Sequence, residues 1–93
     1  MVKIKWTKWS FKDLRAIYNY ISMDSSFYAT RFIQKLISRV DQLIEQPESG
    51  RIVPEKEDTS IRELIEGNYR IIYRFQGENV TILRIHNSAR KIK

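Results

Sequence analysis

Arginine is the residue type whose number and spacing in this sequence best support chemistry on an anionic group. Arg70 and Arg74 lie in a run of alternating residue types, so both would occupy one face of a β-strand. Two guanidinium groups on one strand face can bind a phosphate. They can equally form ion pairs with Glu63 or Glu66 on the neighbouring strand, and the sequence leaves both interpretations open. Three further arginines extend this cluster: Arg62, Arg84 and Arg90.

His86 is the one histidine of the chain, and there is no cysteine. Histidine can act as a general acid near neutral pH, although a single histidine at the end of a strand more often serves packing. The lack of cysteine excludes a disulfide scaffold, a thiol nucleophile and a cysteine-based zinc site. One histidine also argues against a catalytic metal centre. We therefore expect no metal and no cofactor.

Charge is distributed unevenly along the chain, which has 17 Lys and Arg against 11 Asp and Glu and a net charge of +6. Residues 1–44 hold 8 basic and 3 acidic residues, residues 45–68 hold 3 and 7, and residues 69–93 hold 6 and 1. Two basic segments therefore flank an acidic one. This pattern favours an anionic partner, either a nucleic acid or an acidic protein segment.

The length and composition fit one small globular domain spanning residues 1–93, since 42% of the residues are hydrophobic. The N-terminal lysines interrupt any apolar run long enough for a signal peptide. No segment reaches the roughly 18 apolar residues of a membrane span. We expect a cytoplasmic protein that contacts no membrane.

The first half of the chain predicts a strand followed by two helices. Residues 2–6 alternate between apolar residues and lysine, which is typical of a short strand. Ser10 and Asp13 have the spacing of a capping box, and an amphipathic helix is predicted to begin at Ser10. Polar residues at 24–26 supply a new N-cap, and an apolar stripe from Ala29 to Leu43 follows. Such a short break predicts an antiparallel helical hairpin.

The second half predicts a loop and three strands. Residues 47–59 hold both prolines and show no sustained period, so we expect a surface loop. Residues 60–66, 69–76 and 80–86 are strand-like and are separated by short turns, which predicts an antiparallel meander. The fold class is therefore α+β, in the order βααβββ. Because one helical layer covers one sheet face, we expect the other face to stay open.

Aromatic residues are abundant in the first thirty positions. Trp6 and Trp9 stand close to the first strand and are expected to pack in the core and against a helix. The hairpin supplies more aromatic surface than one small core needs. Some of these rings should therefore be exposed and available to a partner: Tyr18, Tyr20, Phe27 and Tyr28.

Several short segments together resemble the RelE/ParE superfamily of bacterial toxins from type II toxin-antitoxin systems. The matching segments are Pro54-Glu55, Ile61-Arg62-Glu63-Leu64, Tyr69-Arg70-Ile71-Ile72-Tyr73-Arg74 and Ile85-His86-Asn87-Ser88-Ala89-Arg90. The helix-to-loop junction at Leu43, Pro47, Gly50 and Arg51 fits as well. The resemblance spans almost the whole chain and implies the same fold that the periodicity predicts.

The superfamily contains two kinds of toxin, and both have counterparts in this sequence. One kind cleaves messenger RNA on the ribosome. For that kind the resemblance implies a catalytic set in which Arg70 and Arg90 bind the phosphate, His86 acts as acid, and Glu55 is a loose counterpart of a catalytic glutamate. The ParE branch, which includes plasmid stabilisation proteins, is known for inhibiting DNA gyrase.

The sequence lies nearer the ParE branch. Ile61 and Glu63 replace the lysine pair that one nuclease subgroup carries, and no tyrosine follows Tyr73 to match the late tyrosine of that subgroup. The ending His-Asn-Ser-Ala-Arg resembles the His-Gly-Ala-Arg ending of ParE-like members. We therefore expect an inhibitor of gyrase, with a ribosome-dependent endonuclease, or a degenerate toxin that only binds its antitoxin, as alternatives.

The resemblance also implies partners. A cognate antitoxin is expected to wrap the toxin, DNA gyrase or the ribosome with its messenger RNA is the expected target, and operator DNA is expected to be bound only through the antitoxin. The candidate residues for contact with the antitoxin or target are five arginines and two tyrosines: Arg62, Arg70, Arg74, Arg84, Arg90, Tyr20 and Tyr28.

Overall fold

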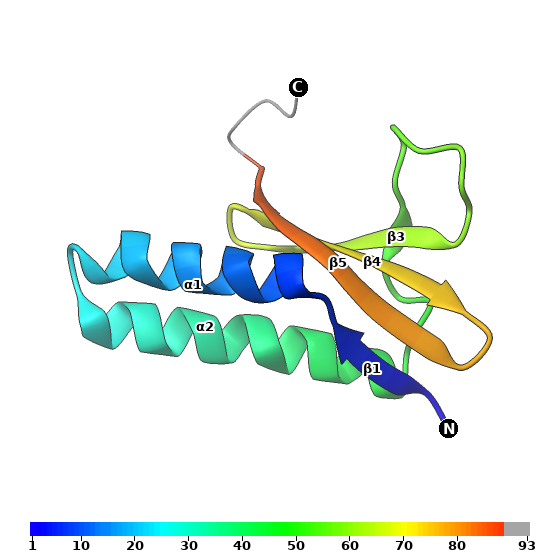
Figure 1. Ribbon diagram of the computed structural model, residues 1–93, viewed down its shortest axis with the longest axis horizontal. Helices are drawn as coiled ribbons and strands as arrows, with labels where there is room; N and C mark the ends of the chain where they lie inside the picture. Colours follow the sequence, from blue (N-terminus) through cyan, green and yellow to red (C-terminus); the bar gives the residue numbers. More distant parts are fainter. Residues whose placement is uncertain (89–93) are drawn as a thin grey trace.

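The computed structural model describes residues 1–88, in which two antiparallel helices pack against a five-stranded sheet (Figure 1). The elements in chain order are β1 (Lys3–Trp6), α1 (Lys8–Ser22), α2 (Ser26–Asp41), a 3₁₀ turn (Gln42–Ile44), β2 (Arg51–Ile52), β3 (Ile61–Glu66), β4 (Tyr69–Gln76) and β5 (Asn79–Asn87). The strand order is β1-β5-β4-β3-β2. The α+β prediction is confirmed, and β1 pairs with β5 in parallel while the other pairs are antiparallel.

The helical hairpin extends well past the sheet, so that its turn lies at the opposite end of the molecule from the N-terminus (Figure 1). Within residues 1–88, no helix has the length and apolar character that crossing a membrane requires. The hairpin is therefore a protruding arm, and part of its surface lies away from the sheet.

The start of α1 differs from the prediction by three residues. Thr7, not Ser10, is the N-cap, and its hydroxyl oxygen accepts a hydrogen bond from the Ser10 amide at 3.1 Å. The Thr7 hydroxyl also reaches the carbonyl of Ile82 on β5 at 2.7 Å. Ser10 lies fully buried inside the first turn and donates its hydroxyl to the Thr7 carbonyl. The contact with β5 selects Thr7 as the cap, and the local pattern could not reveal it.

The predictions for α2 are confirmed. The Ser25 hydroxyl caps the helix by accepting from the Tyr28 amide at 3.2 Å. The helix and its 3₁₀ extension end before Pro47. The apolar stripe is buried, with Ala29, Leu36, Val40 and Leu43 all at 0% exposure.

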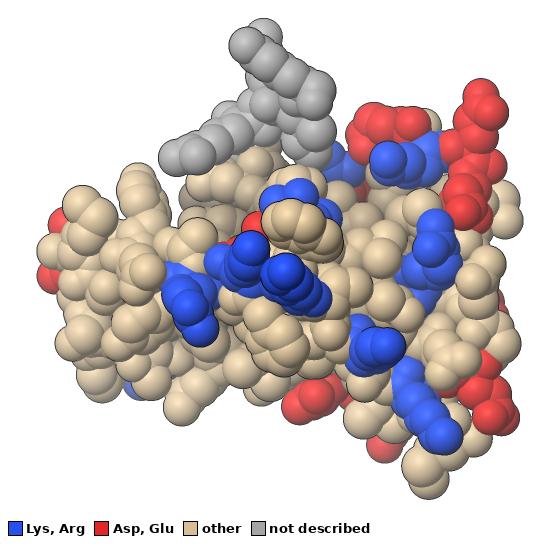
Figure 2. All heavy atoms as spheres, in the orientation of Figure 1, with Lys and Arg blue, Asp and Glu red and all other residues tan. Residues whose placement is uncertain are grey.

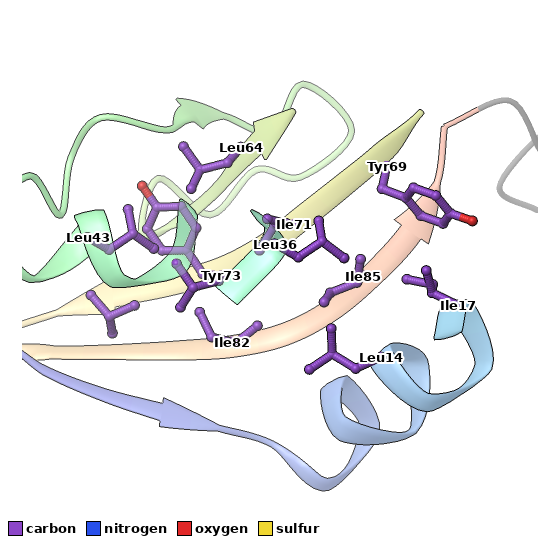
Figure 3. Packing of buried hydrophobic residues seen from close by; sticks show 12 residues of the cluster. Leu14, Ile17, Leu36, Leu43, Leu64, Tyr69, Ile71, Tyr73, Ile82 and Ile85 are labelled. Atoms are coloured by element: carbon purple, nitrogen blue, oxygen red, sulfur yellow. The ribbon is translucent and has the colours of Figure 1, made fainter. Parts of the chain in front are cut away.

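The main core lies between the hairpin and the sheet. The alternation that puts Arg70 and Arg74 on one face of β4 turns Tyr69, Ile71 and Tyr73 toward the helices. Figure 3 shows Leu14 and Ile17 of α1 beside Ile85 of β5. Burial of these side chains is the dominant favourable term in folding, at about 25 cal/mol per Å² of apolar surface.

The Tyr73 hydroxyl anchors the segment that follows α2. It donates to the Pro47 carbonyl at 2.8 Å and accepts from the Gly50 amide at 3.0 Å. Gly50 is buried against this ring, and a Cβ atom there would lie 2.6 Å from the Tyr73 oxygen and 2.7 Å from the Glu63 carbonyl. Glycine at this position lets the chain enter β2 in contact with the core.

The expectation of an open second sheet face is wrong over part of its area. Val53, Ile61 and Ile72 are buried together there, and Leu83 packs against them. The segment predicted as a surface loop folds back over β3, with the Val53 amide bonded to the Ile61 carbonyl at 3.3 Å. This segment also contributes β2, a strand of two residues that is too short to produce a recognisable period.

The expectation for the tryptophans is half right. Trp6 is half-buried, packs against the main core and stacks on Phe11 with ring centroids 5.8 Å apart. Trp9 is 56% exposed, so its predicted role in packing is wrong. Lys12 lies 4.9 Å and Arg84 lies 6.0 Å from the centroid of its ring. Trp9 therefore contacts two cations at the surface.

The close approach at Gly50 yields a stability prediction. We expect Gly50→Ala to lower the free energy of unfolding by about 3 kcal/mol, because the new methyl group overlaps a ring and a backbone oxygen. Gly77→Ala is the matched control. At Gly77 φ is +59° and no atom lies within 4 Å of the position that a Cβ atom would take, so only the backbone penalty of about 1 kcal/mol applies. Urea unfolding measures both, and equal losses would contradict the packing argument.

Candidate functional site: an arginine–carboxylate network on the sheet

A buried carboxylate lies on the sheet face that points away from the helices. Glu63 of β3 is 1% exposed, and its two carboxylate oxygens accept hydrogen bonds from different arginines. Arg51 of β2, its partner in the strand register, donates through Nε to one oxygen. Arg70 of β4 donates through Nε to the other. One carboxylate therefore links three strands, and we call Glu63 with Arg51, Arg70 and Glu55 the Glu63 network.

Arg70 has a second carboxylate partner of different exposure. Its Nη2 donates to Glu55 Oε2 at 2.8 Å, and the Glu55 side chain is 60% exposed. The Arg70 hydrogen bond lowers the pKa of Glu55. Reciprocally, the bonds to Glu55 and Glu63 raise the pKa of Arg70, so its charge is permanent. Of the two interpretations of Arg70, the structure shows the ion pair, with Glu63 as partner.

The other predicted partner, Glu66, lies on the helix side of the sheet. Its carboxylate pairs with Lys35 and Arg39 of α2, each at 3.3 Å. It therefore fastens β3 to the hairpin and leaves the Glu63 network unaffected.

Arg74 is weakly paired. Its Nη2 lies 3.6 Å from the Asp58 carboxylate, and both side chains are partly exposed. Its Nε is buried and has no hydrogen-bond partner within residues 1–88. A buried donor without a partner is costly, and Nε is not reachable from solvent, so only the partly exposed end of this guanidinium is available to a further acceptor.

Arg84 is held by Asp13 of α1. The two side chains form a pair of hydrogen bonds at 2.9 and 3.1 Å, and Asp13 also accepts from the Ile85 amide at 2.8 Å. Pairing of β5 with β1 ends at Ile82, so Asp13 satisfies a backbone donor that the sheet leaves unpaired. Asp13 therefore pairs with the backbone of β5, and the capping-box role predicted for it in α1 is wrong.

His86 lies opposite Arg70 in the β4–β5 register. Burial lowers its pKa from the ordinary value of 6.5, and the charge of Arg84 lowers the pKa further, partly opposed by Asp13. The imidazole is therefore mainly neutral at pH 7. A general acid must carry the proton that it donates, so the neutral imidazole of His86 is the less favourable form for that role.

The structure brings together most, but not all, of the predicted site residues. Arg70, Arg74, Arg84, His86 and Glu55 share the face away from the helices or its rim. Arg62 points to the opposite face, where its guanidinium donates to the carbonyls of Glu48 and Gly50 at 3.1 and 2.8 Å. Arg90 lies outside the described residues.

Sequence reasoning missed two participants. Arg51 belongs to the two-residue strand that gives no periodic signal, and Asp58 lies in the segment expected to be a surface loop. The alternation of β3 places Glu63 on the same face as Ile61, which is the one available hint that Glu63 is buried. Within residues 1–88, no three His, Asp or Glu side chains gather to form a candidate metal site.

The two predicted tyrosines lie on the hairpin, away from the Glu63 network. Tyr20 is 63% and Tyr28 67% exposed, as expected of a contact surface. Phe27, Tyr28 and Phe32 line a shallow groove of about 600 Å³ along α2, which continues to Ser38. We call it the α2 groove. It is the second place where this chain could receive a partner.

Comparison with known proteins identifies the family. The model of the family described as "ParE toxin of type II toxin-antitoxin system, parDE" matches residues 4–92. The chain therefore belongs to the ParE toxin family. It is also 35% identical over 91 residues to the protein named Toxin RelE2 of Caulobacter vibrioides, covering 97% of this chain and 99% of the relative.

Solved structures agree with the ParE fold. The chain superposes on a structure described as the chromosomal ParDE toxin-antitoxin system of P. aeruginosa, with a TM-score of 0.75, 27% identity, and coverage of 94% and 96% of the two chains. The toxin-antitoxin complex RelBE2 of Mycobacterium tuberculosis gives a TM-score of 0.70 at 19% identity, covering 92% and 96%, and supports the fold alone. The chain is thus a type II toxin of the RelE/ParE superfamily.

Glu63 provides the stability prediction for this ParE toxin. We expect Glu63→Gln to lower the free energy of unfolding by about 3 kcal/mol or more, because the part-buried charge of Arg70 loses its fixed counter-charge. Glu55→Gln is the matched control and should change stability little, since Glu55 is solvated. Urea unfolding at pH 7 tests both variants. A Glu63→Gln protein as stable as the Glu55→Gln protein would contradict the role assigned to the buried carboxylate.

Proposed function

We propose that this ParE-family toxin acts by binding and inhibiting an essential cytosolic protein, with DNA gyrase as the first candidate, and that a cognate antitoxin holds it inactive. The observation that carries the proposal is the match of the ParE family model to residues 4–92. Binding of this kind requires a shaped surface and no reacting group.

The chemistry of the Glu63 network supports inhibition by binding. Cleavage of RNA needs a base for the 2′-hydroxyl, an acid for the leaving oxygen, and cations on the phosphate. Here the charge of Arg70 is already neutralised by Glu63 and Glu55. His86, the candidate acid, is mainly neutral because its pKa is lowered. Both groups would have to change state before they could serve that reaction.

The alternative is a ribosome-dependent messenger RNA endonuclease. It is favoured by the 35% identity to a relative named Toxin RelE2 and by the register that places His86 opposite Arg70. In this alternative a phosphate would displace the exposed Glu55 from Arg70, while the buried Glu63 would hold the guanidinium in place.

Induction of the toxin in growing cells distinguishes the two functions. We expect growth arrest with DNA damage and no new messenger RNA ends, together with inhibition of supercoiling by purified gyrase. His86→Ala should retain toxicity, since inhibition by binding needs no acid. Arg70→Lys preserves the charge beside Glu63, so it should fold, and it serves as the second variant of the comparison.

The outcome that contradicts the gyrase proposal is equally definite. New messenger RNA ends that disappear in His86→Ala and fall at least ~100-fold in Arg70→Lys would establish the endonuclease, since loss of a preorganised donor costs that much in rate. Intact gyrase activity at saturating toxin, without new ends, would leave a chain that only binds its antitoxin.

The antitoxin is proposed to contact both the α2 groove and the sheet face. The P. aeruginosa structure is described as a toxin-antitoxin system, which supports a cognate partner for this chain. The α2 groove offers exposed aromatic anchors, and the sheet face offers the partly exposed guanidinium end of Arg74. These surfaces lie toward opposite ends of a molecule 40 Å long (Figure 1). An antitoxin segment that reaches both must therefore be extended, with apolar residues for one surface and acidic residues for the other.

Two substitutions test this docking. Tyr28→Ala should weaken antitoxin binding at least tenfold, mainly through faster dissociation, because it removes an aromatic anchor. Arg74→Glu should slow association and weaken its salt dependence, because its guanidinium lies at a solvated rim. Phe11→Ala, at an exposed aromatic outside the α2 groove, is the control. Wild-type kinetics for Tyr28→Ala and Arg74→Glu in a biosensor measurement would place the antitoxin elsewhere.

A further inference from the structure

Five basic side chains form a row on a surface that neither the Glu63 network nor the α2 groove uses. All five are exposed, and none forms an ion pair within residues 1–88: Lys3, Lys5, Lys8, Lys12 and Arg15. Figure 2 shows basic side chains following one another on this face over β1 and α1. We call these five residues the basic band. By contrast, Arg51, Arg70, Arg74 and Arg84 on the sheet each have a carboxylate partner.

The geometry of the two elements produces this row. Lys8, Lys12 and Arg15 follow the i, i+4, i+7 spacing of one helix face, so they lie about 6 Å and 4.5 Å apart along α1. Lys3 and Lys5 are separated by roughly 6.6 Å on the outward side of β1, while Ile4 packs against the core. Thr7 joins the two elements directly, so the combined length of the band is roughly 20 Å.

Protection of a sheet edge explains only part of the band. Lysines on an edge strand discourage pairing with other chains, and β1 is an edge strand. This accounts for Lys3 and Lys5. It does not account for three unpaired cations along the adjoining face of α1, where like charges at i and i+4 destabilise a helix. An anionic partner would offset that repulsion.

We propose that the basic band binds the phosphate backbone of double-stranded DNA. Duplex DNA presents about one negative charge per 1.7 Å of its axis, so a row of this length faces roughly a dozen phosphates. Lysine and arginine without fixed carboxylate partners can neutralise phosphates and release counterions on binding. The contact needs no groove and no base-specific hydrogen bond.

The aromatic residues beside the band favour a duplex over a single strand. Recognition of single strands relies on open ring faces on which unstacked bases can lie. The ring of Trp9 has Lys12 and Arg84 against it, and the ring of Phe11 stacks on Trp6. Both side chains are more than half exposed, but each ring already has a cation or another ring against it, which leaves less open face for an unstacked base. Trp9 instead holds Lys12 at the surface, where its ammonium group can contact a backbone phosphate.

The inference goes beyond the proposed function and is independent of the target that the toxin inhibits. The helical part of the band, on the exposed face of α1, lies away from the α2 groove. Lys3 and Lys5 share the sheet face of Arg74, since Lys5 and Arg74 are both register partners of Thr81. A toxin bound to its antitoxin would therefore keep at least the α1 part of the band, Lys8, Lys12 and Arg15, free to contact DNA. The chain itself would then add phosphate contacts to those that the sequence led us to expect from the antitoxin alone.

Fluorescence anisotropy with a labelled 20-base-pair duplex of mixed sequence tests the proposal on the purified full chain. We expect sequence-independent binding whose log K falls linearly with log salt, with a slope of about −3 to −4.5 for up to five phosphate contacts. Lys8→Glu should reduce the magnitude of this slope by at least about 1 and weaken binding severalfold at low salt. Lys8 is the first residue of α1, where a carboxylate favours the helix, so this variant should fold.

Lys56→Glu is the matched control, because Lys56 is also exposed, also lacks an ion pair within residues 1–88, and lies in the acidic loop. Both substitutions change the net charge equally, and only Lys8→Glu should alter DNA binding strongly. Equal effects of the two variants would show that DNA binding depends only on the net charge of the chain, which would overturn the proposal. Tighter binding of a 20-nucleotide single-stranded RNA, or of polyglutamate, than of the duplex would overturn it as well.

Discussion

The buried carboxylate of Glu63 is the interaction on which the second half of the structure depends. Taking a carboxylate out of water is expensive, and it is stable here because Arg51 and Arg70 donate to its two oxygens from either side. These bonds join β2, β3 and β4, and they fix the position at which the chain returns from the helices to the sheet. The Tyr73 hydroxyl acts at the same junction through Pro47 and Gly50. A polar network and an aromatic ring thus replace the regular structure that this segment lacks.

This arrangement gives Arg70 two carboxylate partners of opposite character. Glu63 is buried and cannot leave without a large cost, whereas Glu55 is solvated and can be exchanged for another anion. The guanidinium is therefore held in a fixed orientation while one of its donors remains accessible. Such a group suits recognition of a carboxylate or a phosphate by an otherwise rigid surface. It also explains how Arg70, which the sequence resemblance offered as a phosphate-binding residue, can serve mainly to organise the sheet.

The charged residues of this small domain form groups with different roles. Four arginines of the sheet, Arg51, Arg70, Arg74 and Arg84, are paired with acidic residues of neighbouring strands, loops and helix α1, so they stabilise the fold. The lysines of β1 and α1 are exposed and form no ion pair within residues 1–88, so their charge is available to an anionic partner. The α2 groove contributes apolar contact area at the protruding end of the hairpin. Three surfaces of distinct chemistry on one chain are consistent with a toxin that meets more than one macromolecule.

The sequence by itself determined the α+β order, an N-cap for α2 within residues 24–26, the buried stripe of α2 and the alternation of β4 that turns Tyr69, Ile71 and Tyr73 away from the face of Arg70 and Arg74. These features depend on neighbours a few residues apart, so local spacing reveals them. Tertiary structure decided that Thr7 caps α1, that Val53 is buried, that Trp9 is exposed, and that Glu63 and Asp13 are the partners of Arg70 and Arg84. Each of these depends on a contact with a residue from another element, up to 75 positions away for Thr7 and Ile82. Alternation can assign a side chain to a face, but only the packed chain selects which of several carboxylates lies within reach of an arginine.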